Sequence, residues 1–301
     1  MIKVKKDKLY LITGASGFLG HKLVERVLNL GAKVRVVSRN EGKLLELKEK
    51  FPSIEYITGD ISEYSVCHMS MKDVSGVFHL AAFKHVGLAE VQAKECIKSN
   101  VIGSLHILDI SLQSPKCEFI LGVSTDKAAQ VAGVCGATKF LMESLFQNYE
   151  KMNDKCKYRL VRYGNVLYST GSVLCKWKAL LEKQQDIIIT DPKATRFYWT
   201  VNQAIELIFN CLENATSSKP FIPGMKAISL ENLAKAMQMK YGQWTFDKFT
   251  PEDQPIESFC LSQIKQIGLQ KGENLHEKIL EDGPDSSQCE QYTLEEIYKL
   301  I

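Results

Sequence analysis

The sequence predicts an α/β protein built on a doubly wound parallel sheet. Short apolar runs alternate with stretches of helical periodicity five times in the first half of the chain, without a break. A glycine-rich turn follows the first apolar run. Small and charged side chains follow several of these runs, at the strand ends where open parallel sheets bind ligands. With 301 residues and 45% hydrophobic content, the chain can bury a large core.

Composition excludes several classes of function. The net charge of +3, from 38 basic and 35 acidic residues, is too small to favour a nucleic-acid partner. No apolar run reaches the length of a membrane span, and the opening MIKVKKDK leads into a strand without a signal-peptide pattern. The nine cysteines are scattered, which predicts neither disulfides nor a metal site and indicates a reduced, cytoplasmic compartment.

The first predicted strand, 8–14, leads into a turn with glycines three residues apart. A helix follows, with an apolar face formed by Leu19, Leu23 and Val27. Glycines let the backbone approach a pyrophosphate, and the helix N-terminus offers free N–H groups. The order strand, glycine turn, helix therefore predicts a Rossmann-type dinucleotide site at Gly14, Ser16, Gly17, Phe18, Leu19 and Gly20.

The second predicted strand, 33–37, bears on which dinucleotide binds. It ends in Ser38-Arg39-Asn40, where an NAD site would normally carry an acidic residue for the ribose hydroxyls. Arg39, with Lys43 one helical turn later, suits a 2′-phosphate instead. We therefore predict NADP; NAD is the alternative if the two cations are only solvated surface residues.

Two further strands, 53–59 and 74–80, continue the pattern. The first ends at Asp60-Ile61, where an acid can accept a hydrogen bond from the adenine amino group. The second ends at Ala81-Ala82, which are small enough for a cofactor to lie against the backbone. Lys84 and His85 follow, and a helix is expected from about 89 to 111.

The fifth predicted strand, 117–123, leads to the densest group of reactive side chains. The tip Ser124-Thr125 is followed by Asp126 and Lys127, and the next helix carries Cys135 and Lys139. A hydroxyl, a carboxyl, a thiol and two amines are thus placed at one strand end and on the helix after it. The alternative is an ordinary strand-loop-helix segment with solvated charges.

The second half is expected to form the substrate side. A sixth strand, 158–163, is followed by a helix at 173–183, a strand at 187–190 and a turn fixed by Pro192. A helix at 201–213 returns to the core, and 221–222 begins a small mixed region with a helix at 230–240. We predict an NADP-binding domain at 1–166 and a smaller α/β substrate-binding region at 167–301, with some segments returning to the core.

Several motifs together resemble the extended short-chain dehydrogenase/reductase family. They are TGASGFLG, HLAAFKHV, STDKA, GATK, RYGNV and DPKATRF, and 272–277 (GENLHE) is similar to a PGEKLHE segment of that family. The resemblance covers nearly the whole chain and is closest to the inverting UDP-N-acetylglucosamine 4,6-dehydratases. It implies an NADP-dependent lyase of carbohydrate biosynthesis that acts on UDP-N-acetylglucosamine, as a homo-oligomer.

The resemblance also implies roles for individual residues. Such an enzyme oxidises C4 of the sugar by hydride transfer to NADP⁺, eliminates water across C5 and C6, and returns the hydride to C6. Asp126 and Lys127 match the family's acid and base, Lys139 would hold the nicotinamide ribose, and Thr125 or Ser124 would hydrogen-bond the 4-oxygen. The substrate would contact Lys84, His85, Asn165, Tyr168, Arg196 and Glu273, and Lys84 would also contact the cofactor.

One position departs from the family pattern. The proton-accepting tyrosine of YxxxK is replaced by Cys135, whose thiol beside Lys139 can become a thiolate near neutral pH and so keep acid–base competence. A cysteine sulfur reaches less far than a tyrosine oxygen, so it would need a bridging water or a shifted substrate. Three interpretations follow: Cys135 substitutes directly, another hydroxyl such as Tyr168 substitutes, or the redox chemistry at C4 is altered.

Altered chemistry would make the protein a 5,6-dehydratase that returns hydride to C4 and releases an unsaturated sugar. A catalytically silent NADP or nucleotide-sugar binder is a second alternative, which loss of the tyrosine favours. A nucleotide-sugar epimerase or reductase is a third, and Asp126 and Lys127 argue against it because epimerisation needs no elimination acid and base. Thr170 and Gln270 stand where the family often has arginine, which bears on substrate identity.

Overall fold

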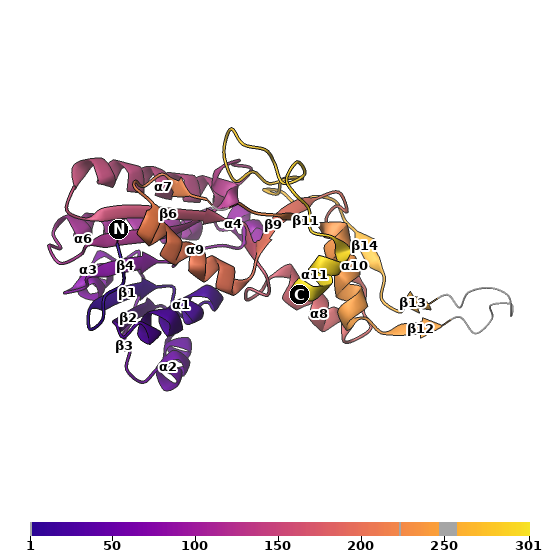
Figure 1. Ribbon diagram of the computed structural model, residues 1–301, viewed down its shortest axis with the longest axis horizontal. Helices are drawn as coiled ribbons and strands as arrows, with labels where there is room; N and C mark the ends of the chain where they lie inside the picture. The colour runs from indigo at the N-terminus through magenta and orange to yellow at the C-terminus, as the bar shows by residue number, and fades with distance from the viewer. Residues whose placement is uncertain (1, 223, 247–257) are drawn as a thin grey trace. The chain divides into compact units, whose positions relative to one another are not determined.

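The computed structural model describes residues 2–222, 224–246 and 258–301 (Figure 1). The chain divides into two compact units. Unit 1 comprises Met1–Gly164, Val201–Gly224 and Lys278–Gly283, and unit 2 comprises Asn165–Thr200, Met225–Glu277 and Pro284–Ile301. The polypeptide therefore passes between the units several times, and each unit is described by itself.

Unit 1 contains a seven-stranded sheet in the order β10-β6-β5-β4-β1-β2-β3, with every pair parallel. The strand order reverses between β1 and β4, which defines the crevice where such sheets bind ligands. This topology confirms the predicted doubly wound Rossmann-type fold. The strands are β1 (Leu9–Thr13), β2 (Lys33–Ser38), β3 (Glu55–Thr58), β4 (Gly76–His79), β5 (Phe119–Thr125), β6 (Lys157–Tyr163) and β10 (Pro220–Phe221).

Helices of unit 1 pack in two groups. In the first group, α1 (Phe18–Asn29) packs against α9 (Val201–Asn214). In the second, α6 (Gly103–Leu112) packs against both α3 (Tyr64–Met71) and α7 (Val134–Met152). Helix α2 (Glu41–Lys50) packs against β3. An apolar stripe on α1, formed by Leu23, Val24 and Val27, is fully buried. Strand and helix side chains such as Ile120, Phe146 and Leu160 share one core.

The prediction of one continuous helix from about 89 to 111 is wrong, because this segment forms several shorter helices. The structure has α4 (Val86–Val91), α5 (Ala93–Ile97), a π-helical turn η1 (Lys98–Ile102) and then α6. Gln92 leaves the helical region with φ −125° and ψ 47°, which separates α4 from α5. In the π-helical turn, Asn100 accepts a hydrogen bond from the backbone N–H of Phe83 (2.7 Å) and donates one to its carbonyl (3.0 Å). These tertiary bonds accompany the local departure from α-helical geometry.

The segment 221–222 is also placed differently from its prediction. It was expected to begin a separate small region, whereas β10 pairs in parallel with β6 and forms an edge strand of the unit 1 sheet. The pairing involves only Pro220 with Leu160 and Phe221 with Val161. Proline is compatible with this place because an edge strand does not need every N–H for pairing.

Unit 2 has a three-stranded sheet and a helical core. The sheet, in the order β11-β9-β7, consists of β7 (Asn165–Val166), β9 (Thr195–Trp199) and β11 (Ala227–Ser229). Helix α10 (Leu230–Tyr241) packs against α8 (Val173–Leu181) and α11 (Leu294–Leu300), burying Trp177, Met237 and Ile297. Two strand pairs complete the unit: β8 (Ile187–Ile189) with β14 (Ile264–Gln266), and β12 (Trp244–Phe246) with β13 (Ser258–Cys260).

Within the described part of the chain, no helix combines the length and apolar character needed to cross a membrane.

Candidate functional site

The glycine turn between β1 and α1 is closely packed. Gly14 has φ +69°, and a Cβ atom there would lie 2.7 Å from the backbone nitrogen of Ala81. A Cβ at Gly20 would lie 2.4 Å from the Gly14 carbonyl oxygen. Gly17 is the N-cap of α1, and it makes no side-chain capping bond to the first turn, which includes Phe18 and Leu19. The turn therefore brings uncapped backbone N–H groups and a helix N-terminus to one place, which suits a dinucleotide pyrophosphate.

A side chain at the end of β1 holds the backbone that follows β4. The hydroxyl of Thr13 accepts hydrogen bonds from the N–H groups of Leu80 and Ala81, both at 3.1 Å. His79 is buried between Thr13 (2.9 Å) and Ser104 (2.9 Å), and burial lowers the pKa of its imidazole to about 3. His79 is therefore a neutral core residue. Ala81 and Ala82 are half-buried after this anchored strand end.

The end of β2 carries the residues predicted to choose between NADP and NAD. The hydroxyls of Ser16 and Ser38 are 2.9 Å apart, so the structure brings the first two strand ends together. Arg39 is 59% exposed at its side chain and lies 3.5 Å from a carboxylate oxygen of Asp60. The backbone N–H of Lys43 donates to Asn40, the N-cap of α2 (2.9 Å). Arg39 and Asp60 thus form an exposed pair that can be rearranged at low cost.

Three further residues of the predicted site, Ile61, Lys84 and His85, differ in exposure. The Ile61 side chain is buried, and a Cβ at Gly103 would lie 2.6 Å from it, so the side chain belongs to the core. Lys84 is exposed, and His85 is the N-cap residue of α4. Both lie in the segment between β4 and α4, directly after Phe83, whose backbone Asn100 holds.

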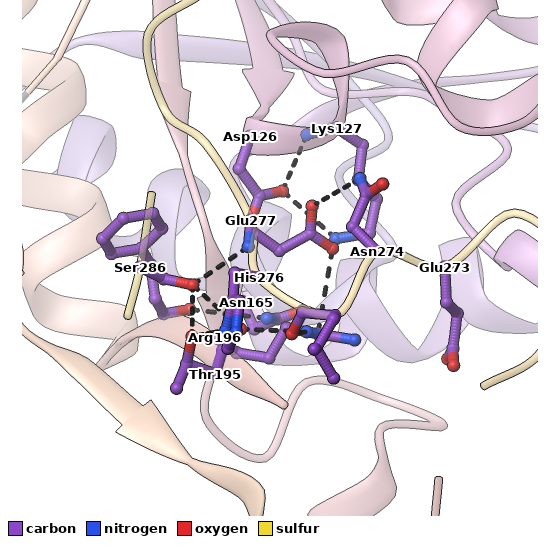
Figure 2. A network of polar contacts seen from close by, with 12 residues as sticks. Asp126, Lys127, Asn165, Thr195, Arg196, Glu273, Asn274, His276, Glu277 and Ser286 are labelled. Atoms are coloured by element: carbon purple, nitrogen blue, oxygen red, sulfur yellow. Dashed lines mark hydrogen bonds and ion pairs between the residues drawn. The ribbon is translucent and has the colours of Figure 1, made fainter. Parts of the chain in front are cut away.

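The tip of β5 carries a buried carboxylate. Thr125 is the last residue of the strand, and Asp126–Ala128 form a 3₁₀ turn (η2). Asp126 is fully buried, and its Oδ1 accepts a hydrogen bond from the Thr125 hydroxyl (2.7 Å). The same oxygen accepts hydrogen bonds from the Lys127 N–H (2.9 Å) and the Lys127 ammonium (3.1 Å) (Figure 2). Among the described residues, Oδ2 has no hydrogen-bond partner. A buried oxygen in that state marks a place for a ligand hydroxyl or water.

Helix α7 presents Cys135 and Lys139 one turn apart. The Lys139 ammonium donates to the carbonyl of Val123 (2.8 Å), on β5, and burial lowers its pKa to about 8. The thiol of Cys135 is 4% exposed and lies 3.8 Å from the carbonyl of Phe83. Burial raises the pKa of this thiol, and the charges of Lys139 and Lys127 offset only part of that rise. A thiolate near neutral pH is therefore disfavoured, contrary to the sequence-based argument from Lys139, because burial outweighs the nearby cations.

Sequence reasoning missed two charged residues beside this tip. Glu143, on α7, and Arg162, on β6, are buried and form an ion pair at 2.5 Å. The Ser124 hydroxyl donates to Glu143 (2.5 Å), so Ser124 does not face the same way as Thr125. A signal was available, since Arg162 follows Leu160-Val161 in a buried strand and Glu143 lies four residues after Lys139.

In unit 2, Asn165 and Tyr168 lie close in sequence but serve different contacts. Asn165 begins β7, and its amide donates to the carbonyl of Phe197 (3.4 Å). Tyr168 has a left-handed φ of 55°, and its hydroxyl lies 3.0 Å from that of Tyr241 and 3.8 Å from the sulfur of Met237. Burial raises the pKa of Tyr168. Its hydroxyl is thus engaged within unit 2, which argues against a role as substitute proton acceptor.

Arg196 lies in strand β9, directly after the turn fixed by Pro192. Its guanidinium donates to the carbonyls of Thr195 and Leu275, both at 2.9 Å, and lies 3.8 Å from the carboxylate of Glu277 (Figure 2). These contacts hold the segment 273–277 to β9. Glu273 accepts a hydrogen bond from the backbone of Gln270 (3.2 Å).

A hydroxyl network continues from β9. The Thr195 hydroxyl lies 2.8 Å from Nδ1 of His276 and 2.6 Å from the hydroxyl of Ser286 (Figure 2). The N–H of Glu277 donates to Ser286 (2.9 Å). Unit 2 therefore contains an ordered and largely buried polar network that joins β9 to the 273–277 segment.

Residues 10–300 match the family described as "Polysaccharide biosynthesis protein", and the chain belongs to this family. This finding confirms the family-level part of the predicted resemblance.

The chain is similar over most of its length to three relatives, two of which have a named activity. The chain is 34% identical to an uncharacterized membrane protein of Methanocaldococcus jannaschii, over 97% of this chain and 84% of the relative. It is 30% identical to the inverting UDP-N-acetylglucosamine 4,6-dehydratase of Campylobacter jejuni (91% and 77%). It is 33% identical to a UDP-glucose 4-epimerase of Rickettsia bellii (77% and 70%).

Solved structures have the same fold. Pen from Bacillus thuringiensis superposes with a TM-score of 0.87 at 28% identity, covering 99% of this chain and 98% of that one. The dTDP-glucose 4,6-dehydratase of Streptomyces venezuelae, solved with NAD bound, gives 0.76 at 15% identity (97% and 95%). At 15% identity, the similarity to the Streptomyces venezuelae structure shows a shared fold alone.

Proposed function

We propose that this protein is an NADP-dependent nucleotide-sugar dehydratase that carries out 4,6-dehydration of UDP-N-acetylglucosamine. One observation carries the proposal: the buried Asp126 keeps one oxygen without a partner among the described residues, while its other oxygen binds Thr125 and Lys127. A carboxyl, a hydroxyl and an amine at one strand end are the groups that an elimination requires. The family and the 30% identity to a named dehydratase support the same reaction.

The glycine turn fits the cofactor. The close approach at Gly14 and Gly20 and the uncapped start of α1 would receive the pyrophosphate, and Arg39 would pair with a 2′-phosphate. Asp60 would accept from the adenine, and Lys139 would hold the nicotinamide ribose. When bound, the cofactor would accept hydride from C4 of the sugar and return it later.

Asp126 and its neighbours would then move the protons. Thr125 already donates to Asp126, so its hydroxyl can pass the proton of the sugar 4-OH to this carboxylate. Lys127, in its neutral amine form, would remove the proton from C5 and become an ammonium, and Asp126 would return its own proton to the 6-oxygen, which leaves as water. Lys127 would finally protonate C5. The net change is the loss of one water, with no external acid or base consumed.

A second candidate is 5,6-dehydration, in which hydride returns to C4. The observation that favours it is the protonated, buried thiol of Cys135 at the position where the family has a tyrosine. Without a phenolate there, handling of the proton at the 4-oxygen depends on Thr125 and Asp126 alone. Reduction at C4 would restore the hydroxyl and leave a double bond between C5 and C6.

Mass spectrometry and proton NMR of the purified protein with NADP⁺ and UDP-N-acetylglucosamine test the proposal. Loss of one water with a new 6-methyl signal is the expected result. Loss of water with vinylic signals would select 5,6-dehydration. A sugar of unchanged mass but altered ring coupling constants would indicate an epimerase, and an unaltered sugar with bound NADP would indicate a silent binder; either result would contradict a dehydratase.

A further inference from the structure

A cluster of charged residues in unit 1, two of them buried and one exposed, lies next to the tip of β5. It consists of Arg162 on β6, Glu143 on α7 and Glu281 in the segment 278–283 of unit 1, and we call it the Arg162 cluster. Arg162 is 1% exposed and Glu143 is 3% exposed. Charges buried to this degree are costly unless each one is paired and hydrogen-bonded.

The guanidinium of Arg162 meets that requirement in full. Its Nε donates to Glu143 Oε1 (3.1 Å), and its Nη2 donates to Glu143 Oε2 (2.5 Å) and Glu281 Oε1 (2.9 Å). Its Nη1 donates to the carbonyl of Ile279 (2.8 Å) and to Glu281 Oε2 (3.3 Å). All five N–H groups are therefore directed to acceptors, and a planar fork held on both sides has little freedom to move.

This cluster is tied directly to the residues proposed for acid–base chemistry. The Ser124 hydroxyl donates to Glu143 Oε1 at 2.5 Å, and Ser124 is followed in the chain by Thr125 and Asp126. Glu143 lies one helical turn after Lys139 on α7, and Lys139 itself donates to Val123 of β5. One carboxylate thus connects the strand that carries Asp126 with the helix that carries Cys135 and Lys139.

We propose that Glu143 and Arg162 are positioning residues that hold the tip of β5 in register with α7, so that Thr125, Asp126 and Lys127 keep a fixed place relative to Lys139. Stability alone does not account for the arrangement, because an apolar pair of similar volume is often at least as stabilising as a buried ion pair. The part of this inference that concerns catalysis rests on the proposed dehydratase function. The part that concerns the position of the tip does not.

A matched control is present on the same two elements. Glu150 lies two turns after Glu143 on α7 and pairs at 3.4 Å with Arg159, three residues before Arg162 on β6. Arg159 is also buried, and Glu150 accepts hydrogen bonds from Ser218. Among the described residues, neither member of this pair forms a hydrogen bond with the β5 tip, so the pair reports the effect of breaking an ion pair elsewhere between α7 and β6.

The test compares Glu143→Gln, Arg162→Lys and Ser124→Ala with Glu150→Gln. The first readout is backbone hydrogen exchange over 124–129, where the N–H groups of Lys127 and Ala129 both bond to Asp126. We expect faster exchange there in the three cluster variants and unchanged exchange there in Glu150→Gln. Ser124→Ala removes one hydroxyl and leaves the ion pairs intact, so it keeps the test usable if the charge variants fold poorly.

The second readout is steady-state kinetics. We expect kcat to fall at least tenfold in the cluster variants while KM and the affinity for NADP stay within about twofold, because binding groups are unchanged. Unchanged exchange over 124–129, or equal losses in Glu150→Gln, would overturn the inference. If the wild-type protein has no dehydratase activity, the proposed function fails, and hydrogen exchange alone still decides whether the cluster positions the tip.

Discussion

Cys135 and Lys139 lie one helical turn apart, and burial changes the pKa of each in the opposite direction. The pKa of the Cys135 thiol is raised, and the pKa of the Lys139 ammonium is lowered to about 8. Both shifts disfavour the charged form of a group in a poorly solvated place. Near neutral pH the pair is therefore a neutral thiol beside an ammonium rather than a thiolate–ammonium pair.

A neutral thiol predicts a small effect of Cys135→Ala on catalysis. We expect turnover to change by less than about tenfold, whereas loss of a general base costs about 10²–10⁴. The measurement is kcat for sugar conversion, with Cys135→Ser as the isosteric control. A fall of two orders of magnitude in Cys135→Ala, restored in part by serine, would show that the residue handles a proton after all.

The lowered pKa of Lys139 predicts that the free energy of unfolding depends on pH, with a definite sign. Its pKa is about 8 in the folded protein against 10.5 ordinarily, so between these values the unfolded chain holds more protons. The unfolding free energy of the wild type should therefore rise as pH increases from 8 to 10.5, by at most about 3 kcal/mol from this group.

Urea unfolding of wild type and Lys139→Met at pH 7 and pH 10 checks this expectation. Methionine removes the titrating group, so the stability difference between variant and wild type should move in favour of the wild type at the higher pH. A difference that stays constant with pH would show that Lys139 has an ordinary pKa.

At the scale of elements, the β1–turn–α1 unit is the best test of cofactor binding. A Cβ at Gly20 would lie 2.4 Å from the Gly14 carbonyl oxygen and 2.6 Å from the Ala15 Cα, and neither backbone atom can move alone. We expect Gly20→Ala to weaken NADP binding by more than about tenfold, equivalent to about 1.4 kcal/mol, measured by calorimetry.

Gly42→Ala is the matched control for that substitution. Gly42 lies in α2, and a Cβ there would meet only the Asn40 side chain at 3.6 Å. Alanine should stabilise this helix by about 0.5–1 kcal/mol and leave NADP affinity unchanged. Equal NADP affinity in Gly20→Ala and wild type would remove the glycine turn from the proposed site.

The elements also show what local sequence does and does not determine. Apolar runs predicted β1 to β6, most clearly for β1, β4, β5 and β6, which are mostly buried; the edge strand β3 is largely exposed. The break at Gln92 and the π-helical turn at Asn100 carry no periodic signal in the sequence. The turn is accompanied by hydrogen bonds between Asn100 and Phe83, which are distant in the chain. The two-residue strand β10 was too short to be recognised, and its pairing with β6 is set by the sheet rather than by its own residues.

At the scale of the whole molecule, contacts between residues far apart in the sequence could not be predicted from the sequence. Thr125, Asp126 and Lys127 could be predicted as neighbours because they are consecutive at a strand end. The contact of Arg162 with Glu281 joins residues 119 positions apart, and the segment 278–283 joins unit 1 although the chain on both sides belongs to unit 2. No spacing rule anticipates such a return of the chain.

Cofactor choice can be read from the stability of the whole protein, because a ligand that binds only the folded state raises Tm. We expect NADP to raise Tm more than NAD at equal concentration, and Arg39→Ala to remove most of that difference. Lys116→Ala, an exposed lysine paired with Asp73 before β5, is the control that should leave it unchanged. A larger shift with NAD in the wild type would contradict the NADP assignment.

The measurement that tests the proposed chemistry most directly is deuterium incorporation at C5 of UDP-N-acetylglucosamine in D₂O, followed by proton NMR. If Lys127 removes and returns the C5 proton, the product should lack one water, carry deuterium at C5 and show a 6-methyl signal, and Lys127→Met should abolish all three changes. A product without deuterium at C5, or full conversion by Lys127→Met, would contradict the roles given to Asp126 and Lys127.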